Sequence, residues 1–291
     1  MLAIFKRECR SYFNGLLGYL LCAFMVLVNG LYFWALNLTY GMPDFGYYTL
    51  YRTMFVLLIF VPILTMRSLA EERKNRTDQL LLTSPVSVQG IVLGKFFSLC
   101  TIFAIPCLIS VVMILTLAAA GATTTATLAN FACLLCYFFM GAAAIAVGEF
   151  ISGLTENTII AAIGTFAVLL LSYLMPSIQS MFTAGSVLAM IAFVAVLSIA
   201  SVLVGLQTRS LTVGCVTFCA CCVLLALLYQ FQGTWLTTAF TWVMEKLSLF
   251  APYEDFVNQI FSVPALVYYV LVTALFLFFS CQTLEKRRWN A

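Results

Sequence analysis

The feature that most constrains this chain is a series of uninterrupted apolar runs, each about 20 residues long, which is the length of a helix that crosses a bilayer. Of its residues 64% are hydrophobic and 9% charged, whereas soluble domains carry about 25% charged residues. Membrane β-strands are about 10 residues long and alternate apolar with polar side chains, which these runs do not do. Because backbone polar groups at membrane depth must pair within the protein, we predict an all-α polytopic helical bundle.

The apolar runs predict about eight transmembrane helices. Their expected limits are 15–36, 53–69, 96–120, 128–148, 158–175, 186–206, 211–229 and 263–281. The first run is longer than the 7–15-residue core of a signal peptide, and no small-x-small cleavage site follows it. We therefore expect it to be retained as a membrane anchor.

Residues 1–14 form an amphipathic segment ahead of the first span. Apolar side chains fall near one helical face and basic ones on the other. The two sets are Leu2, Phe5, Cys9, Tyr12 and Phe13, and Lys6, Arg7 and Arg10. This pattern predicts an interfacial helix at the cytoplasmic surface, and it is also what an ordinary basic flank would look like.

Lys and Arg are distributed unevenly along the predicted topology. If the N-terminus is cytoplasmic, only Arg52 and Lys246 of the 14 Lys and Arg residues fall on the outer side. Eight spans also return the C-terminus to the cytoplasm. We therefore expect a multi-pass protein of the plasma (inner) membrane with both termini cytoplasmic.

Two inner segments stand out. Residues 70–95 are rich in charge, and Ser87 is expected to cap the helix that continues into the third span. This segment reads either as a solvated loop or as a docking surface for a soluble partner. The second segment, 149–157, has two carboxylates and no Lys or Arg. Glu149 is expected at a cytoplasmic end that water reaches, and Thr155 is expected to cap the fifth span.

The outer segment 233–262 is too apolar for a plain loop. Its apolar side chains recur at helical spacing, with Trp235 and Trp242 as interfacial aromatics and Pro252 as a break. We predict two short helices at the outer interface. A surface helix without a transport role fits the same pattern.

Several kinds of chemistry find no support in the sequence. Histidine is absent, and the nearest approach to a P-loop, residues 90–96, is one residue short and has Phe96 in place of Ser or Thr. Cys133 and Cys136 lie in mid-span without other ligands, so packing is a better reading than metal or redox chemistry. No mid-membrane acid is present to couple ions. We expect no enzyme activity, no cofactor or metal in this chain, no nucleic-acid binding, and energy that arrives from outside the chain.

Three stretches, 66–96, 150–157 and 249–289, resemble the type-2 ABC transporter permeases, close to the gliding-motility permease branch. The first includes the run Met-Arg-Ser-Leu-Ala-Glu-Glu-Arg, which starts at residue 66. Residues 5–13 are similar to the interfacial elbow helix of that family. In all, the likeness covers 1–175 and 247–289.

The resemblance implies a six-span permease core that exports substrate as a homo- or heterodimer of permease subunits, together with cytoplasmic ABC ATPase subunits that bind ATP and Mg²⁺. The whole chain, 1–291, would be one permease domain, with 176–232 as an inserted helix pair. The first inner loop would be the coupling segment and 149–157 a second ATPase contact. Carried over residue by residue, the ATPase-coupling set is Glu71, Glu72, Arg73, Lys74, Arg76, Asp78, Glu149, Thr155, Glu156 and Asn157.

Two other functions were weighed against a permease. A non-transporting membrane scaffold that uses an ATPase in motility or cell-envelope work would have the same 70–95 segment, and ATP-dependent flux in vesicles separates the two. An intramembrane enzyme would need a polar constellation at membrane depth, which the sequence does not contain.

Overall fold

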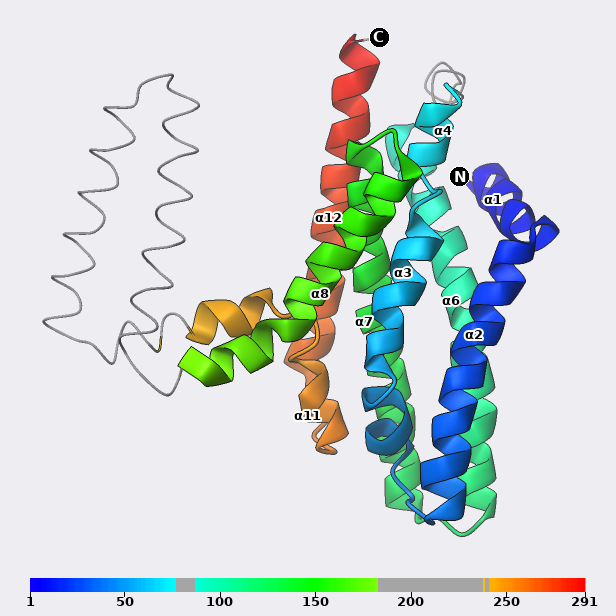
Figure 1. Ribbon diagram of the computed structural model, residues 1–291, viewed down its shortest axis with the longest axis vertical. Helices are drawn as coiled ribbons and strands as arrows, with labels where there is room; N and C mark the ends of the chain where they lie inside the picture. The colour runs from blue at the N-terminus through cyan, green and yellow to red at the C-terminus, as the bar shows by residue number, and fades with distance from the viewer. Residues whose placement is uncertain (77–86, 183–237, 239–240, 291) are drawn as a thin grey trace, which may run out of the picture. The chain divides into compact units, whose positions relative to one another are not determined.

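The computed structural model describes residues 1–76, 87–182, 238 and 241–290, and all regular secondary structure in them is helical. The chain divides into two compact units, one formed by 1–171 with 252–291 and the other by 172–251. The first unit contains the long helices of Figure 1 that lie beside one another. In the second unit, residues 241–247 form a helix.

Six helices among the described residues are long and apolar enough to cross a membrane. They are Leu16–Thr39, Met54–Lys74, Val88–Ala119, Thr124–Leu154, Thr158–Ser180 and Val263–Lys286. The prediction of an all-α polytopic protein is therefore confirmed at these six positions. The predicted spans 186–206 and 211–229, and with them most of the expected inserted pair, lie outside the described residues.

The N-terminal helices follow one another directly along the chain. Helix α1 (Leu2–Asn14) precedes α2 (Leu16–Tyr32), which continues as a π-helix (Phe33–Thr39). After a second π-helical stretch (Gly46–Tyr51) and a 3-10 turn (Met54–Val56), α3 (Leu57–Thr65) and the short α4 (Ala70–Lys74) form the next rod. The remaining helices are α6 (Val88–Ala119), α7 (Thr124–Leu154), α8 (Thr158–Phe182), α11 (Tyr253–Val257) and α12 (Val263–Asn290).

Helix α7 is the central element of the first unit, and it contacts α3, α4, α6, α11 and α12. Of its most apolar 18-residue window 72% is buried, against 17% for α12, whose apolar surface is largely exposed. Small residues make this central position possible, because Ala143, Ala144 and Ala146 are fully buried and let neighbouring helices approach closely.

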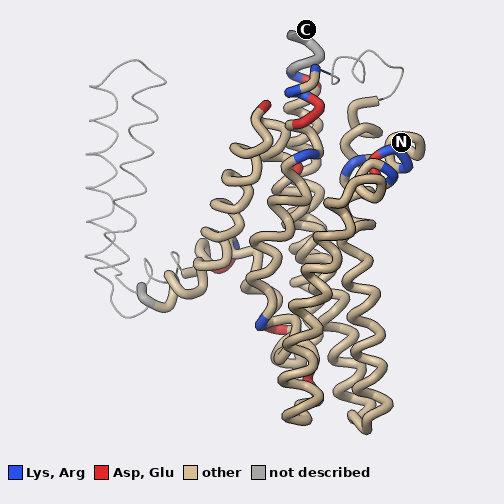
Figure 2. The backbone as a smooth tube through the Cα atoms, turned by 45° about the vertical axis from the view of Figure 1, so that its right-hand side comes forward, with Lys and Arg blue, Asp and Glu red and all other residues tan. Residues whose placement is uncertain are grey.

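Both ends of the first unit's chain lie at the same end of the bundle (Figure 1). Most of its charged positions gather there as well (Figure 2). This placement agrees with two termini on one side of a membrane. That the side is cytoplasmic, and that α1 lies in the membrane interface, remain predictions.

The structure corrects the predicted loop 149–157. Helix α7 continues to Leu154, so only residues 155–157 connect it to α8. Ser152 and Gly153 are weak helix formers, but tertiary contacts override that preference. The predicted cap at Thr155 is also wrong, because Asn157 Oδ1 accepts the hydrogen bond from Ile159 N at 2.9 Å. The cap predicted at Ser87 is confirmed, since its Oγ accepts from Gly90 N at 3.2 Å.

Candidate functional site

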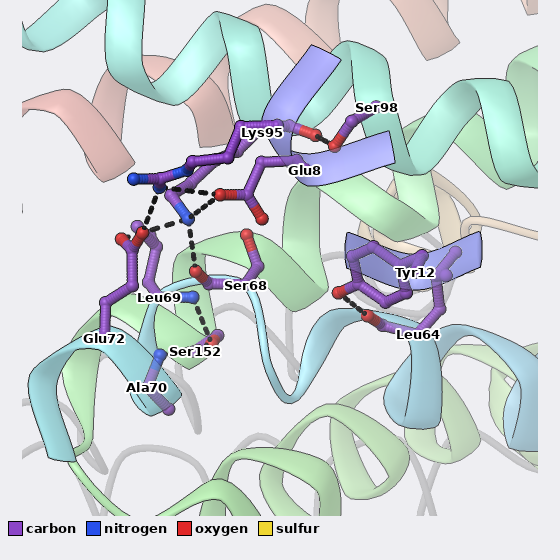
Figure 3. A network of polar contacts seen from close by, with 11 residues as sticks. Glu8, Tyr12, Leu64, Ser68, Leu69, Ala70, Glu72, Lys95, Ser98 and Ser152 are labelled. Carbon is purple, nitrogen blue, oxygen red and sulfur yellow. Dashed lines mark hydrogen bonds and ion pairs between the residues drawn. The ribbon is translucent and has the colours of Figure 1, made fainter. Parts of the chain in front are cut away.

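One hydroxyl near the C-terminal end of α7 anchors the start of the short helix α4. Ser152 Oγ accepts hydrogen bonds from Leu69 N at 3.2 Å and Ala70 N at 3.0 Å (Figure 3). The first N–H groups of a helix have no partner inside the helix. A side chain of α7 therefore supplies the cap that α4 itself lacks, and α4 starts where α7 holds it.

Lys95, near the start of α6, is the centre of a buried ion-pair network. Its side chain is only 1% exposed, and its Nζ donates to Ser68 O at 2.8 Å (Figure 3). The same ammonium lies 3.0 Å from Glu72 Oε2 and 3.3 Å from Glu8 Oε1. One cation thereby connects α6 to the turn before α4, to α4 itself and to α1.

Arg7 completes what we call the Lys95 network, which consists of Arg7, Glu8, Ser68, Glu72 and Lys95. Its Nη2 donates to Glu8 Oε1 at 2.8 Å and to Glu72 Oε1 at 2.7 Å. The hydrogen bond to Glu8 raises the pKa of Arg7, with further support from the charges of both carboxylates against partial burial. Two acids and two bases balance each other, which allows Lys95 to be buried between Glu8 and Glu72, while the Arg7 side chain stays 53% exposed.

Tyr12 adds a contact between α1 and α3. The buried Tyr12 hydroxyl donates to Leu64 O at 2.9 Å (Figure 3). Burial raises the pKa of Tyr12, so the phenol stays a neutral donor. Helix α1 is thus fixed to the bundle by one neutral hydrogen bond and by the ion pairs of the Lys95 network.

Arg73 brings the two predicted inner segments together. Its side chain is 6% exposed, its Nη1 donates to Gly153 O at 2.5 Å, and its Nη2 lies 3.6 Å from Glu156 Oε1. Helix α4 is therefore joined to the end of α7 and to the short connection that follows. Among the predicted coupling residues, Glu72, Arg73 and Glu156 take part in contacts between elements.

The other predicted coupling residues fall into different surroundings. Lys74 and Arg76 are exposed, Glu71 pairs only loosely with Arg67 at 3.8 Å, and Asp78 lies outside the described residues. Thr155 and Asn157 accept backbone hydrogen bonds at the start of α8.

The expectation that water reaches Glu149 is wrong. Its side chain is 0% exposed, and its carboxylate accepts no hydrogen bond from any residue that the structure describes. The reason is that residue 149 lies inside α7, one turn before Ser152, where α7 packs against the rod of α3 and α4. A partner protein cannot touch this side chain while the helices are arranged in this way.

Sequence reasoning missed the centre of the site. Lys95 lies within the charged segment 70–95, but neither it nor Glu8 was predicted as a site residue. Each carried a usable signal, because Lys95 is the lone cation among the apolar residues that begin α6, and Glu8 is the lone acid of the basic segment 1–14. A single charged side chain that is buried is costly unless an opposite charge lies close to it.

A cavity of about 340 Å³ lies beside the Lys95 network. Three acids and three bases line it, namely Glu8, Glu71 and Glu72, and Arg7, Arg67 and Lys95. No group of three or more Cys, Asp and Glu side chains that could hold a metal ion is found in the described part of the chain. The ion pairs of the Lys95 network hold three helices together, namely α1, α4 and α6.

Replacing Ser152 with alanine should loosen α4 specifically. The variant leaves the N–H groups of Leu69 and Ala70 without their acceptor in a buried position, which costs about 1–3 kcal/mol. Hydrogen exchange in residues 69–74, which include α4, should increase more than hydrogen exchange in α7. Ser172→Ala, in the second unit, is the matched control, and equal exchange in the two variants would contradict the capping role.

A protein-family model described as ABC-2 family transporter protein matches residues 32–190 of the chain, which is more than half of its 291 residues. The matched range contains Glu72, Arg73, Lys95 and Ser152, whereas α1 precedes it. No curated protein and no solved structure matches the chain.

Proposed function

The chain belongs to the ABC-2 transporter family, and from that premise we propose that it is the permease subunit of an exporter whose ATP is hydrolysed by a separate ABC ATPase. Membership makes it a membrane permease component of an ABC transporter, which works in a bilayer and associates with an ABC ATPase. Export, the docking residues, the pairing of permease subunits and the cytoplasmic position of both termini belong to the proposal.

The observation that carries the proposal is the attachment of α4. This helix exposes charge on one side, and on the other it is held to α1, α6 and α7 by the contacts of Glu72, Arg73 and Ala70. Through these contacts a force applied to α4 would be passed to the two long helices α6 and α7. ATP-driven closure of the ATPases would in this way shift the spans between two arrangements.

The predicted coupling residues divide into two roles under this proposal. Glu71, Lys74 and Arg76 have the exposure that a docking surface needs. Glu72 and Arg73 are turned inward and would transmit the movement to the bundle. Charge reversal at the inward pair would disturb folding as well as docking, so a docking test has to use the exposed set.

The triple variant Glu71→Lys, Lys74→Glu, Arg76→Glu should weaken capture of the ATPase that co-purifies with the tagged native chain. We expect roughly a tenfold loss, because opposite charges at the rim of an interface become like charges. Stimulation of ATP hydrolysis should fall in parallel. Lys286→Glu, an exposed charge near the C-terminal end of α12, is the control and should bind normally. Unchanged capture and unchanged hydrolysis by the triple variant would rule out docking at α4.

Export itself rests on family membership and on the resemblance described above. Vesicles that contain the permease and its ATPase distinguish it from the scaffold alternative. An exporter moves substrate when ATP is added on the ATPase side, whereas a scaffold stimulates ATP hydrolysis without flux.

A further inference from the structure

An apolar groove of about 550 Å³ runs between α1 and the spans α6 and α7. Leu2 and Phe5 of α1 line one side, and Phe97, Thr101, Ala104 and Phe138 line the other. This groove is separate from the cavity beside the Lys95 network. Phe97 and Thr101 are exposed, so the groove opens on the outer surface of the first unit.

The groove is preformed because α1 is held firmly on α6. At Gly94 an added Cβ would lie 3.2 Å from Ile4 Cγ2, tighter than most real contacts, so the two helices touch at this point. Ile4 is 7% exposed. The ion pairs from Lys95 and the Tyr12 hydrogen bond then prevent α1 from closing the groove or moving away.

Two basic residues that the sequence pattern predicts opposite the apolar face, Lys6 and Arg10, follow the groove residue Leu2 along α1. Lys6 is four residues after Leu2, and Arg10 four residues after Lys6, so the three are neighbours along one line of the helix surface. Both bases are exposed, and neither has an ion pair with any residue that the structure describes. Arg7 and Lys95, by contrast, are balanced by Glu8 and Glu72.

An apolar groove beside unbalanced positive charge matches the two chemical parts of one kind of molecule. We propose that the groove binds an acyl chain of an anionic phospholipid whose phosphate lies against Lys6 and Arg10. Beyond the groove, the surface of α6 remains apolar, with Leu108 65% and Val112 58% exposed, so the chain would pass directly into the bilayer. The lipid would brace α1 against α6 and thereby support the Lys95 network from its other side. The proposal is independent of ATPase docking at α4.

Native mass spectrometry of the delipidated full chain in detergent tests the site, with phosphatidylglycerol and phosphatidylcholine of the same acyl chains as probes. Each basic residue near an anionic surface contributes about 1 kcal/mol, or roughly a fivefold change in affinity. The native chain should therefore bind phosphatidylglycerol at least about fivefold more tightly. Lys6→Gln with Arg10→Gln should abolish that preference. Glycerol 3-phosphate, which has the phosphate but no acyl chain, should not compete at equal concentration.

A second pair of variants tests the groove rather than the charge. Ala104→Trp fills the groove and should lower binding of both lipids roughly tenfold, an effect of the size expected for losing about 1.4 kcal/mol of apolar burial. Ile163→Trp, at an exposed apolar position of α8 that does not line the groove, should bind as the native chain does. Thr101→Trp repeats the test at an exposed position in case Ala104→Trp unfolds, which a melting curve reveals.

Three results would overturn the proposal. The first is equal binding of the two lipids by the native chain, and the second is native binding by folded Ala104→Trp and Thr101→Trp. The third is loss of a dimer in the groove variants with lipid binding unchanged, which would assign the groove to a second copy of the chain. None of them alters ATPase capture by the α4 surface, so this proposal and the proposed function fail separately.

Discussion

Replacing Lys95 with methionine should destabilise the protein by about 3 kcal/mol, the largest loss that we expect from one substitution. Methionine keeps the length and apolar stem of the side chain but removes the charge. Glu8 and Glu72 then lose a cation at 3.3 and 3.0 Å, and Ser68 O loses its donor. The loss stays near the lower end of the range for a broken buried ion pair, because Arg7 continues to neutralise the two carboxylates.

The measurement is denaturant unfolding in mixed micelles, followed by circular dichroism. Lys74→Met is the control, because Lys74 is exposed and lies at the same end of the bundle, and we expect a change within about 0.5 kcal/mol. A triple variant that adds Glu8→Gln and Glu72→Gln to Lys95→Met should recover part of the stability. If Lys95→Met and Lys74→Met unfolded together, Lys95 would not be the buried centre of this network.

In the variant Lys95→Met, Glu8→Gln, Glu72→Gln, the stimulation of ATP hydrolysis should fall more than the stability of the protein. Its neutral side chains can still pack, but α4 is no longer held to α1 and α6 by charge. If the network transmits movement, the refolded triple variant should capture the ATPase and yet show weaker stimulation of ATP hydrolysis. Native stimulation would show that transmission from α4 uses only Arg73 and Ser152.

Gly141→Ala should destabilise the protein by about 2–3 kcal/mol, in the upper part of the range for overpacking. A Cβ at this position would overlap the ring of Phe103, closer than real Cβ atoms approach other groups. The ring has no room to withdraw, because Phe103 is fully buried against Phe60, Tyr137 and Phe138. The substitution therefore forces α6 and α7 apart at the centre of the first unit.

Thermal unfolding of three variants makes this test specific. Gly30→Ala, where the nearest atom is Met113 Cε at 3.8 Å, should be neutral or stabilising by up to about 1 kcal/mol. Adding Phe103→Leu to Gly141→Ala should restore part of the loss, because the smaller side chain makes room for the new methyl group. A Gly141→Ala variant as stable as Gly30→Ala would mean that α6 and α7 do not pack at Phe103.

Much of the fold could be predicted because the relevant signals are local. Hydropathy over about 20 residues identified the six described spans, and Ser87 marked the start of α6 through a hydrogen bond three residues away. The short connection 155–157 was harder to predict from the sequence. Ser152 and Gly153 look like loop residues, and nothing near them in the chain reveals that Ser152 would serve the N–H groups of α4, more than 80 residues earlier.

The candidate site was predicted at the level of a segment and not at the level of roles. The segment 70–95 stood out by its charge, but charge alone cannot separate Glu71 from Glu72. The first is 45% exposed and the second 15%, and the difference arises because Glu72 faces Lys95 and Arg7. For Glu149 the sequence pattern predicted exposure to water, because the residue lies near a predicted helix end, but the side chain is fully buried.

The sequence by itself determined that this is a helical membrane protein with a charged end, because hydrophobicity and charge are properties of each residue and its neighbours. Only the tertiary structure decided which charges are paired, which are available to a partner and where α4 is attached. Arg7 and Glu72 are 65 residues apart, and Glu8 and Lys95 are 87 apart. Burial and ion pairing depend on which helices pack against one another. The sequence of α1, α4, α6 or α7 taken alone does not reveal these contacts.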